Sequence, residues 1–200
     1  MAVPRLAPYI WASWLAKVMA GETSCLWSPW FRTHNRLIDR HGGPPDLVEW
    51  TMMHARMLTD LTRDLARPGL RLYRERRFQI ANPAYQTIVT GSIDLVAEEP
   101  GEVTVYDCKT GQPAASHEVQ VMLYMYALER DPGTAGKSIR GAVIYKHSRR
   151  DIPYLSNSFA SNFDYFARLL AGTDEMPKAP GRDCAFCPIL REDCPERVEE

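Results

Sequence analysis

The sequence predicts an α/β fold in which helices flank a mixed central sheet, all within one domain that covers residues 1–200. Helix-like and strand-like patterns follow one another in the order α, βββ, α, β, α, which is typical of this architecture. A length of 200 residues and an apolar content of 45% suit a single core. A short Pro-Gly turn at residues 100–101 predicts that two strand-like segments form a hairpin.

Two helices are expected in the first third of the chain. The segment LAPYIWASWLAKVMAG, residues 6–21, superficially resembles a signal peptide, but Pro8, Lys17 and its tryptophans favour an amphipathic core helix. An apolar stripe with helical spacing then runs from Asp46 to Ala66. Its members, which we expect to face inward, are Leu47, Trp50, His54, Met57, Leu58, Leu61 and Leu65.

The remaining elements follow in order. Strands are predicted in RLYRERRFQI, in YQTIVTGSIDLVAEE and, after the turn, in VTVYDCKTG. EVQVMLYMYALER is apolar nearly all round, as expected of a helix that lies flat on a sheet. SIRGAVIYKHS predicts another strand and SNSFASNFDYFARLLAG another helix, whereas the tail from residue 176 has no clear periodicity.

Charge and hydropathy limit the classes of partner that the protein is expected to bind. The net charge of −1 gives no overall sign of a nucleic-acid or membrane partner, and no stretch is long and apolar enough to span a bilayer. We expect a cytoplasmic protein. Two local basic strips can hold phosphates, although they can equally be ordinary solvated arginines. Their candidate DNA-binding residues are Arg74, Arg76, Lys146, Arg149 and Arg150.

A charged pair ends the last strand of the predicted hairpin. Alternation places Asp107 and Lys109 on one face of this strand and Cys108 on the other. Asp94 lies about as far before the turn as Asp107 lies after it, so their Cβ atoms are expected about 4.5–5.5 Å apart. Two carboxylates that close repel each other unless a cation lies between them. Magnesium or manganese suits such oxygen ligands, whereas a D-x-K pair alone also occurs by chance on surface strands.

Three motifs in succession resemble the RecB-like branch of the PD-(D/E)XK nucleases. They are GSIDLV, VYDCKTG and the pair Gln120 and Tyr124 in a Q-x-x-x-Y helix. The resemblance implies a restriction-endonuclease-like core over about residues 46–170. It also implies that Asp94 and Asp107 bind Mg²⁺ or Mn²⁺ and that Lys109 assists the attacking water.

The same resemblance assigns the neighbouring residues. Cys108 would lend only its backbone carbonyl to the metal, with its thiol buried on the far side of the strand, and Gln120 and Tyr124 would line the site. RecB-like nucleases also use a helical histidine in G-x-x-x-H as a metal ligand. His54 is the candidate, although Trp50 stands where the glycine would be and a core histidine is the alternative. Glu75 is either an accessory acid or a local charge partner of the arginines around it.

The five cysteines do not suggest a secreted disulfide framework, because their number is odd and three lie near the C-terminus. Cys184-x-x-Cys187 and Cys194 supply three thiolates, and Cys25 is the remaining candidate for a fourth if Cys108 is buried. Thiolates suit zinc or an iron–sulfur cluster, which ligand count does not separate. The arrangement resembles the iron-staple nucleases, including the CRISPR-associated exonuclease family (the fourth Cas protein). That resemblance implies a [4Fe–4S] cluster that clasps segments of about residues 20–36 and 180–196.

The resemblance also implies a function. Family members are Mg²⁺- or Mn²⁺-dependent deoxyribonucleases, so we expect an exonuclease that degrades single-stranded DNA, often from the 5′ end. CRISPR adaptation, an antiviral defence, is the expected context, with CRISPR integration proteins as partners. The alternatives are a nuclease of phage recombination or repair, and a non-catalytic DNA-binding adaptor that keeps the fold.

Overall fold

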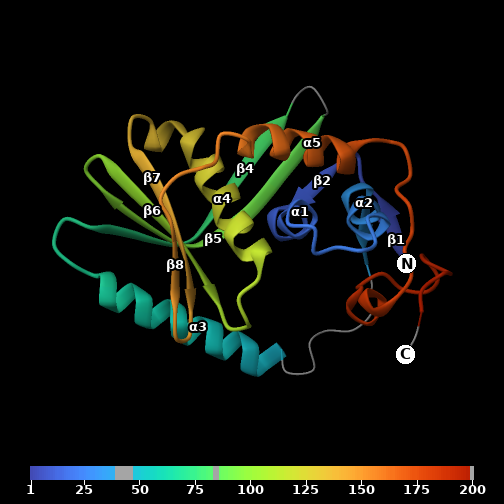
Figure 1. Ribbon diagram of the computed structural model, residues 1–200, viewed down its shortest axis with the longest axis horizontal. Helices are drawn as coiled ribbons and strands as arrows, with labels where there is room; N and C mark the ends of the chain where they lie inside the picture. The colour runs from blue at the N-terminus through green and yellow to red at the C-terminus, as the bar shows by residue number, and fades with distance from the viewer. Residues whose placement is uncertain (39–46, 83–85, 199–200) are drawn as a thin grey trace.

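The computed structural model describes residues 1–38, 47–82 and 86–198. A six-stranded mixed sheet forms its centre, and a separate two-stranded sheet pairs β1 (Ala2–Pro4) with β3 (Asn35–Leu37) (Figure 1). The predicted mixed sheet with flanking helices is confirmed. The central strands are β2 (Tyr9–Trp11), β4 (Arg71–Asn82), β5 (Thr87–Glu99), β6 (Glu102–Lys109), β7 (Ser138–Tyr145) and β8 (Arg149–Ile152).

Strand order and direction make this sheet mixed. Its order is β2-β5-β6-β7-β8, with β4 paired to β5 as well. The pairs β4–β5, β5–β6 and β7–β8 are antiparallel, whereas β2–β5 and β6–β7 are parallel. The predicted hairpin of β5 and β6 is present, and Gly101 in its turn has a φ of +85°, a conformation that favours glycine.

Helices cover both faces of the sheet (Figure 1). The main core lies between the sheet and α1 (Ala12–Met19), α4 (Ala115–Glu129) and α5 (Phe159–Ala171). The second core lies under α3 (Leu47–Leu65) and centres on Leu58, Leu95, Tyr106 and Cys108. As predicted, α4 is apolar on most sides and its residues from Leu123 to Leu128 are all buried.

Two expectations about the helices are wrong. Residues 6–21 do not form one helix, because Tyr9–Trp11 pair in parallel with β5 and α1 begins only at Ala12. The inward stripe of α3 holds from His54 to Leu65, but Trp50 is 48% exposed because the first turns of the helix extend beyond the second core. Asp46, its predicted start, lies outside the described residues.

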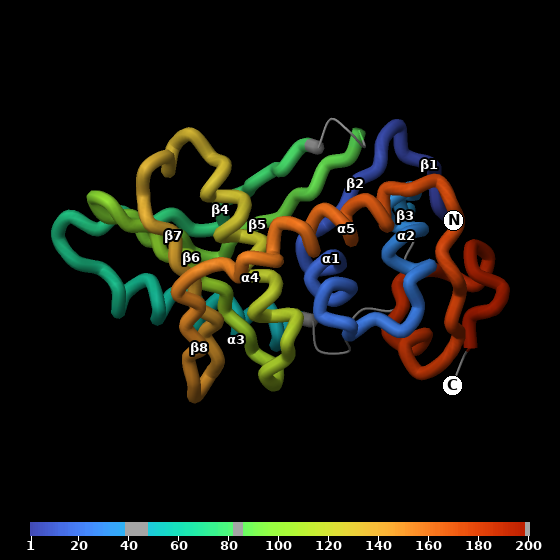
Figure 2. The backbone as a smooth tube through the Cα atoms, turned by 45° about the horizontal axis from the view of Figure 1, so that its top comes forward, coloured from blue at the N-terminus to red at the C-terminus, as the bar shows by residue number. Residues whose placement is uncertain are grey.

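The segment that follows α5, residues 172–198, contains the proline-rich tail and packs against the N-terminal segment (Figure 2). The indole of Trp27, in α2 (Trp27–His34), donates a hydrogen bond to Glu175 at 2.6 Å. The Trp30 indole donates to the carbonyl of Gly172 at 2.8 Å, and the Ser24 hydroxyl donates to Asp183 at 2.6 Å. None of the helices in the described residues has both the length and the hydrophobicity to cross a membrane.

Close approach of α4 to β7 requires a glycine at position 141. A Cβ atom there would lie 2.3 Å from Val121 Cγ1 and 2.9 Å from Met125 Sδ. We predict that Gly141→Ala lowers the free energy of unfolding by about 1–3 kcal/mol, because an overpacked core must shift. Urea unfolding measures this change. Gly111→Ala is the matched control, since nothing lies within 4 Å of its added Cβ, and equal effects of the two substitutions would contradict the packing argument.

Candidate active site

Strands β5 and β6 of the central sheet stop pairing beside Asp94. Because β4 occupies one edge of β5 along nearly all its length, β2 and β6 share the other edge. β2 pairs with residues 88–90 of β5 and β6 pairs with residues 95–99. The β5–β6 register pairs Leu95 with Tyr106, so the next step along the hairpin sets Asp94 opposite Asp107 just where the two strands part. The predicted juxtaposition of the two acids is therefore present.

The pairing of β4 with β5 is also interrupted at Asp94. Glu75 lies opposite Asp94 in register, has a φ of +52° and forms no bridge with it. On β5, Ile93 and Val96 pack in the main core but Leu95 packs in the second core. Regular alternation would put Ile93 and Leu95 on the same face, so the strand changes face at Asp94. The side chain of Glu75 is exposed, and its role as an accessory acid stays a prediction.

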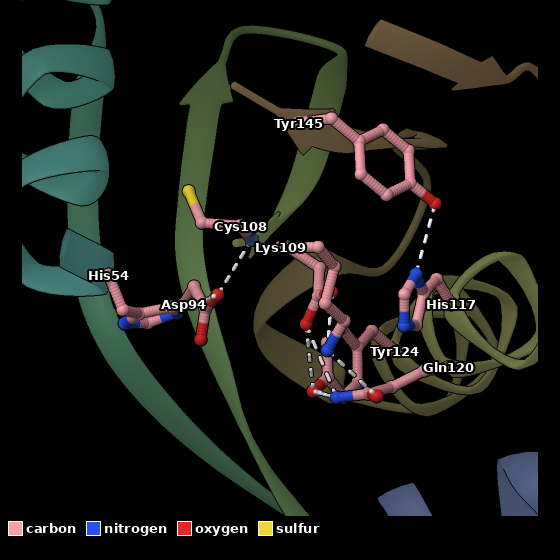
Figure 3. A network of polar contacts seen from close by, with 9 residues as sticks. His54, Asp94, Cys108, Lys109, His117, Gln120, Tyr124 and Tyr145 are labelled. Atoms are coloured by element: carbon pink, nitrogen blue, oxygen red, sulfur yellow. Dashed lines mark hydrogen bonds and ion pairs between the residues drawn. The ribbon is translucent and has the colours of Figure 1, made fainter. Parts of the chain in front are cut away.

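The carboxylate of Asp94 links the hairpin to α3 (Figure 3). Its Oδ2 atom accepts a hydrogen bond from the backbone N–H of Cys108 at 2.7 Å and lies 3.0 Å from His54 Nε2. This hydrogen bond raises the pKa of His54 above its usual value, against the opposing effect of burial. The structure thus brings His54 into the candidate site, as predicted, through a side-chain contact between helix α3 and strand β5.

Asp107 is the most buried member of the site, with 1% of its side chain exposed. Gln120 Nε2 donates to its Oδ1 at 3.2 Å and the Tyr124 hydroxyl lies 3.4 Å from the same atom. Burial raises the pKa of Asp107 to about 6, an effect that Asp94 reinforces and that Lys109 and His54 oppose. The carboxylate is therefore held where its charge is costly without a cation.

Lys109, Gln120 and Tyr124 form one connected group (Figure 3), and each of them contacts Asp107. Lys109 Nζ lies 2.9 Å from Asp107 Oδ2 and donates to Gln120 Oε1 at 3.1 Å. The Gln120 amide also bonds to the Tyr124 hydroxyl, whose pKa burial raises well above its usual value. The tyrosine is therefore a neutral hydroxyl that holds the glutamine in place. All three predicted residues lie together here.

Gly91, the glycine of the GSIDLV segment, lies against the aromatic ring that packs on Tyr124. A Cβ atom at Gly91 would lie 2.7 Å from the ring of Phe78. That ring packs edge-on against Tyr124, with 5.6 Å between the ring centroids. The glycine therefore leaves room for the phenylalanine that buttresses the tyrosine.

Cys108 faces away from this chemistry, as predicted. Its side chain is buried in the second core, next to Leu58 and Tyr106. Burial raises the pKa of its thiol to about 12, so the sulfur stays protonated. The role of its backbone carbonyl as a metal ligand stays a prediction.

The donor set of this site fits a hard divalent cation. Asp107 Oδ2 is buried, and no group in the described residues donates a well-directed hydrogen bond to it despite the nearby ammonium of Lys109. Two carboxylates and one imidazole suit Mg²⁺ or Mn²⁺. Within the described ranges no three His, Cys, Asp or Glu side chains already surround one point. The donors instead contact other side chains, since Asp94 bonds to His54 and Asp107 pairs with Lys109.

Two further polar residues beside Lys109 were not anticipated. His117 Nδ1 lies 3.1 Å from the hydroxyl of Tyr145, whose backbone pairs with Lys109 in the β6–β7 register. Burial, reinforced by the charge of Lys109, lowers the pKa of His117, so a neutral imidazole lies next to the ammonium. The helical spacing of His117 and Gln120 was the signal that could have found it.

The candidate DNA-binding residues are less uniform than their sequence suggests. Arg76 pairs with Asp131 at 2.7 Å, Arg149 with Asp151 at 2.7 Å and Arg150 with Glu118 at 3.3 Å. Arg74 and Lys146 make no ion pair within the described part of the chain. Their contact with DNA stays a prediction.

Four cysteines line one cavity of about 1000 Å³ between the N-terminal segment and the tail: Cys25, Cys184, Cys187 and Cys194. All four are free thiols. The hydroxyl of Ser28 lies 3.4 Å from Cys187 Sγ, and the backbone N–H of Gly181 donates to Cys184 Sγ at 3.5 Å. Lys17, Arg32 and Lys178 line the same cavity. Glu22, Asp183 and Glu196 line it as well, and within the described residues no three of the cysteines surround one point. Four thiols that line one cavity suit zinc or an iron–sulfur cluster by the chemistry of their sulfur atoms.

Comparison with known proteins decides the family. A family model described as the PD-(D/E)XK nuclease superfamily matches residues 27–194. The chain belongs to the PD-(D/E)XK nuclease superfamily. Membership implies a nuclease that hydrolyses phosphodiester bonds, and nucleases of this superfamily typically use Mg²⁺ or Mn²⁺.

Solved structures agree on the fold. The crystal structure of SSO0001 matches 98% of this PD-(D/E)XK chain and 90% of its own chain, with a TM-score of 0.55 and 13% sequence identity. At that identity the likeness shows the fold alone. Comparison with curated proteins gives no match.

The raised pKa of Asp107 predicts a pH-dependent stability of the metal-free protein. Between about pH 4 and pH 6 the native carboxyl binds a proton that the unfolded chain has lost, so stability falls as pH rises through this window. Relative to wild type, Asp107→Asn should therefore gain roughly 2–3 kcal/mol between pH 4 and pH 7, from 1.36 kcal/mol per pKa unit. Urea unfolding in EDTA measures the difference at both pH values.

Asp174→Asn is the control for this experiment, because that side chain is exposed and makes no ion pair within the described residues. Its effect should be nearly the same at the two pH values. A gain for Asp107→Asn that is equally large at pH 4 would show that burial of charge is not the cause.

Proposed function

We propose that this protein is a Mg²⁺- or Mn²⁺-dependent DNA exonuclease that degrades single strands from the 5′ end. The observation that carries the proposal is the buried Asp107 carboxylate opposite Asp94, with the Lys109 ammonium 2.9 Å from it. Together with membership of the superfamily, this arrangement supports hydrolysis of a phosphodiester. Single-strand preference, polarity and a cytoplasmic role in CRISPR adaptation rest on the resemblance of the motifs alone.

The chain's own residues would hold the ion and the water. Asp94 and Asp107, with His54 and the carbonyl of Cys108, are the proposed ligands. A divalent ion held there would supply a Lewis acid for phosphodiester hydrolysis. Water would form the new bond to phosphorus as the bond to the 3′ oxygen breaks, which leaves a 5′-phosphate and a 3′-hydroxyl.

Lys109 would orient the water and stabilise the charge that develops at phosphorus. Its ammonium is fixed from two sides, by Asp107 and by the carbonyl oxygen of Gln120. Tyr124 fixes the amide of Gln120 in turn. A change at Gln120 or Tyr124 would therefore act on the reaction through the position of Lys109.

The catalytic assignment predicts loss of cleavage without loss of fold. Asp94→Ala and Lys109→Met should each lower the cleavage rate of end-labelled single-stranded DNA in Mn²⁺ by at least about 100-fold, since general acid–base and electrostatic groups contribute on this scale. Asp64→Ala, which removes an exposed acid on α3, should cleave like wild type. Equal rates for Asp94→Ala and wild type would contradict the assignment.

Linear and circular single strands test whether the protein is an exonuclease that starts at the 5′ end. A 5′-labelled strand should release its label at once as short products, and a circular single strand should resist cleavage. Rapid cutting of the circle would identify an endonuclease instead. No cleavage of any substrate by a folded protein loaded with metal would support the non-catalytic adaptor.

We propose in addition that the four cysteines that line the cavity between the N-terminal segment and the tail bind a [4Fe–4S] cluster. Protein purified without oxygen should contain about four irons per chain and absorb in the visible range. Cys194→Ala should lose the iron, whereas Cys108→Ala, which changes a cysteine buried in the second core, should keep it. Stoichiometric zinc with no iron would overturn the cluster in favour of a zinc site.

A further inference from the structure

Trp50 is the most exposed of the five tryptophans. It is 48% exposed, against 36% for Trp11 and 3% for Trp27. The indole of Trp30 donates a hydrogen bond to a backbone carbonyl, and the ring of Trp14 lies under the guanidinium of Arg32 at 3.7 Å. Val48, Met52 and Met53 are exposed on the same part of α3, so Trp50 belongs to a group of exposed apolar side chains, and such groups mark binding sites.

The ring of Trp50 rests on a residue of the candidate active site. It stacks on His54, one helical turn further along α3, with 5.5 Å between ring centroids and an angle of 16° between the planes. His54 in turn contacts Asp94 at 3.0 Å. His54 lies against the indole, and about half of Trp50 remains exposed to solvent. A flat apolar surface is thus fixed beside the carboxylates.

Nucleic acid must approach these carboxylates in a nuclease of this superfamily. Bases of a single strand have free faces, and stacking on an exposed aromatic ring is the usual way in which proteins bind them without reading sequence. Bases inside a duplex are stacked on both sides and offer no face. An exposed ring at this place therefore favours a single-stranded or frayed end.

We propose that Trp50 is a stacking platform for one nucleobase of a single-stranded substrate next to the scissile phosphate. The inference rests on the proposed nuclease function and deepens it, because it gives a substrate contact to the residue that stands in place of the glycine of the G-x-x-x-H motif. Trp50 is a substrate-positioning residue here, and His54 orients its ring. Val48 and Met53 are also exposed on this part of α3, so docking of a protein is the competing outcome.

The test measures binding apart from cleavage. Fluorescence anisotropy of labelled single-stranded DNA is recorded in EDTA for wild type, Trp50→Ala and Trp50→Phe. Loss of one stacked base should weaken binding by roughly five- to a hundredfold in Trp50→Ala, and Trp50→Phe should lie between. Trp11→Ala is the matched control, since Trp11 is 36% exposed and lies on β2. It should bind within about twofold of wild type.

Abasic sites identify the stacked base. One abasic residue is moved along the strand, and at one position it should weaken binding by wild type. The same abasic strand should bind Trp50→Ala no worse than the intact strand does, because the two changes remove the same contact. Thermal unfolding of each variant shows that the fold is kept, and Trp50→Phe keeps the test open if Trp50→Ala unfolds.

Two results would overturn the inference. One is equal DNA affinity of folded Trp50→Ala and wild type, which would leave the exposed patch to a protein partner. The other is an abasic penalty of the same size in both proteins. Failure of the nuclease proposal would give a different result. Wild type would then bind single-stranded DNA, and one abasic position would weaken that binding, but the protein would not cleave the DNA in Mn²⁺.

Discussion

Burial of the Asp107 carboxylate is the constraint on which the rest of the site depends. A carboxylate that is 1% exposed needs compensating charge and hydrogen bonds. Lys109 supplies the charge, and Gln120 with Tyr124 supplies the hydrogen bonds from α4. The apolar surface of α4 seals this arrangement against the sheet. Asp94 adds a second negative group where the strands part, and that excess of buried negative charge is what a divalent cation would neutralise.

The central hairpin and its face assignments followed from the sequence, because strand alternation and a Pro-Gly turn are local signals. They placed Asp107 and Lys109 on one face, Cys108 on the other, and Asp94 opposite Asp107. The start of α1 did not follow, since the pairing of Tyr9–Trp11 with β5 joins residues about eighty positions apart. The face change at Glu75 and Asp94 also escaped, because it depends on a positive φ in a residue other than glycine. Helical periodicity marked Trp50 as inward, but it cannot say where a core ends along a helix.

The region around the four cysteines depends on contacts between the N-terminal and C-terminal segments of the chain. Trp27, Trp30 and Ser24 bond to the segment that follows α5, and the four predicted cysteines line a cavity between this segment and the N-terminal one. The spacing of three cysteines near the C-terminus, with Cys25 as the remaining candidate, indicated which thiols would line one cavity, and their role as ligands stays a prediction. It could not predict the hydrogen bonds that hold a tail without periodicity, because those come from side chains far away in the sequence. A cluster or metal in this cavity would join the same two segments covalently.

The central claim is that Asp94 and Asp107 together hold one divalent ion, and direct measurement of Mn²⁺ binding tests it without any assumption about substrate. Electron paramagnetic resonance counts free Mn²⁺ during titration of the protein at pH 7.5. The account predicts saturable binding by wild type and at least about tenfold weaker binding by Asp94→Asn, since one anionic ligand is lost while the shape is kept. Equal binding of Mn²⁺ by Asp94→Asn and wild type would contradict the account, because the facing carboxylates would then not form the metal site.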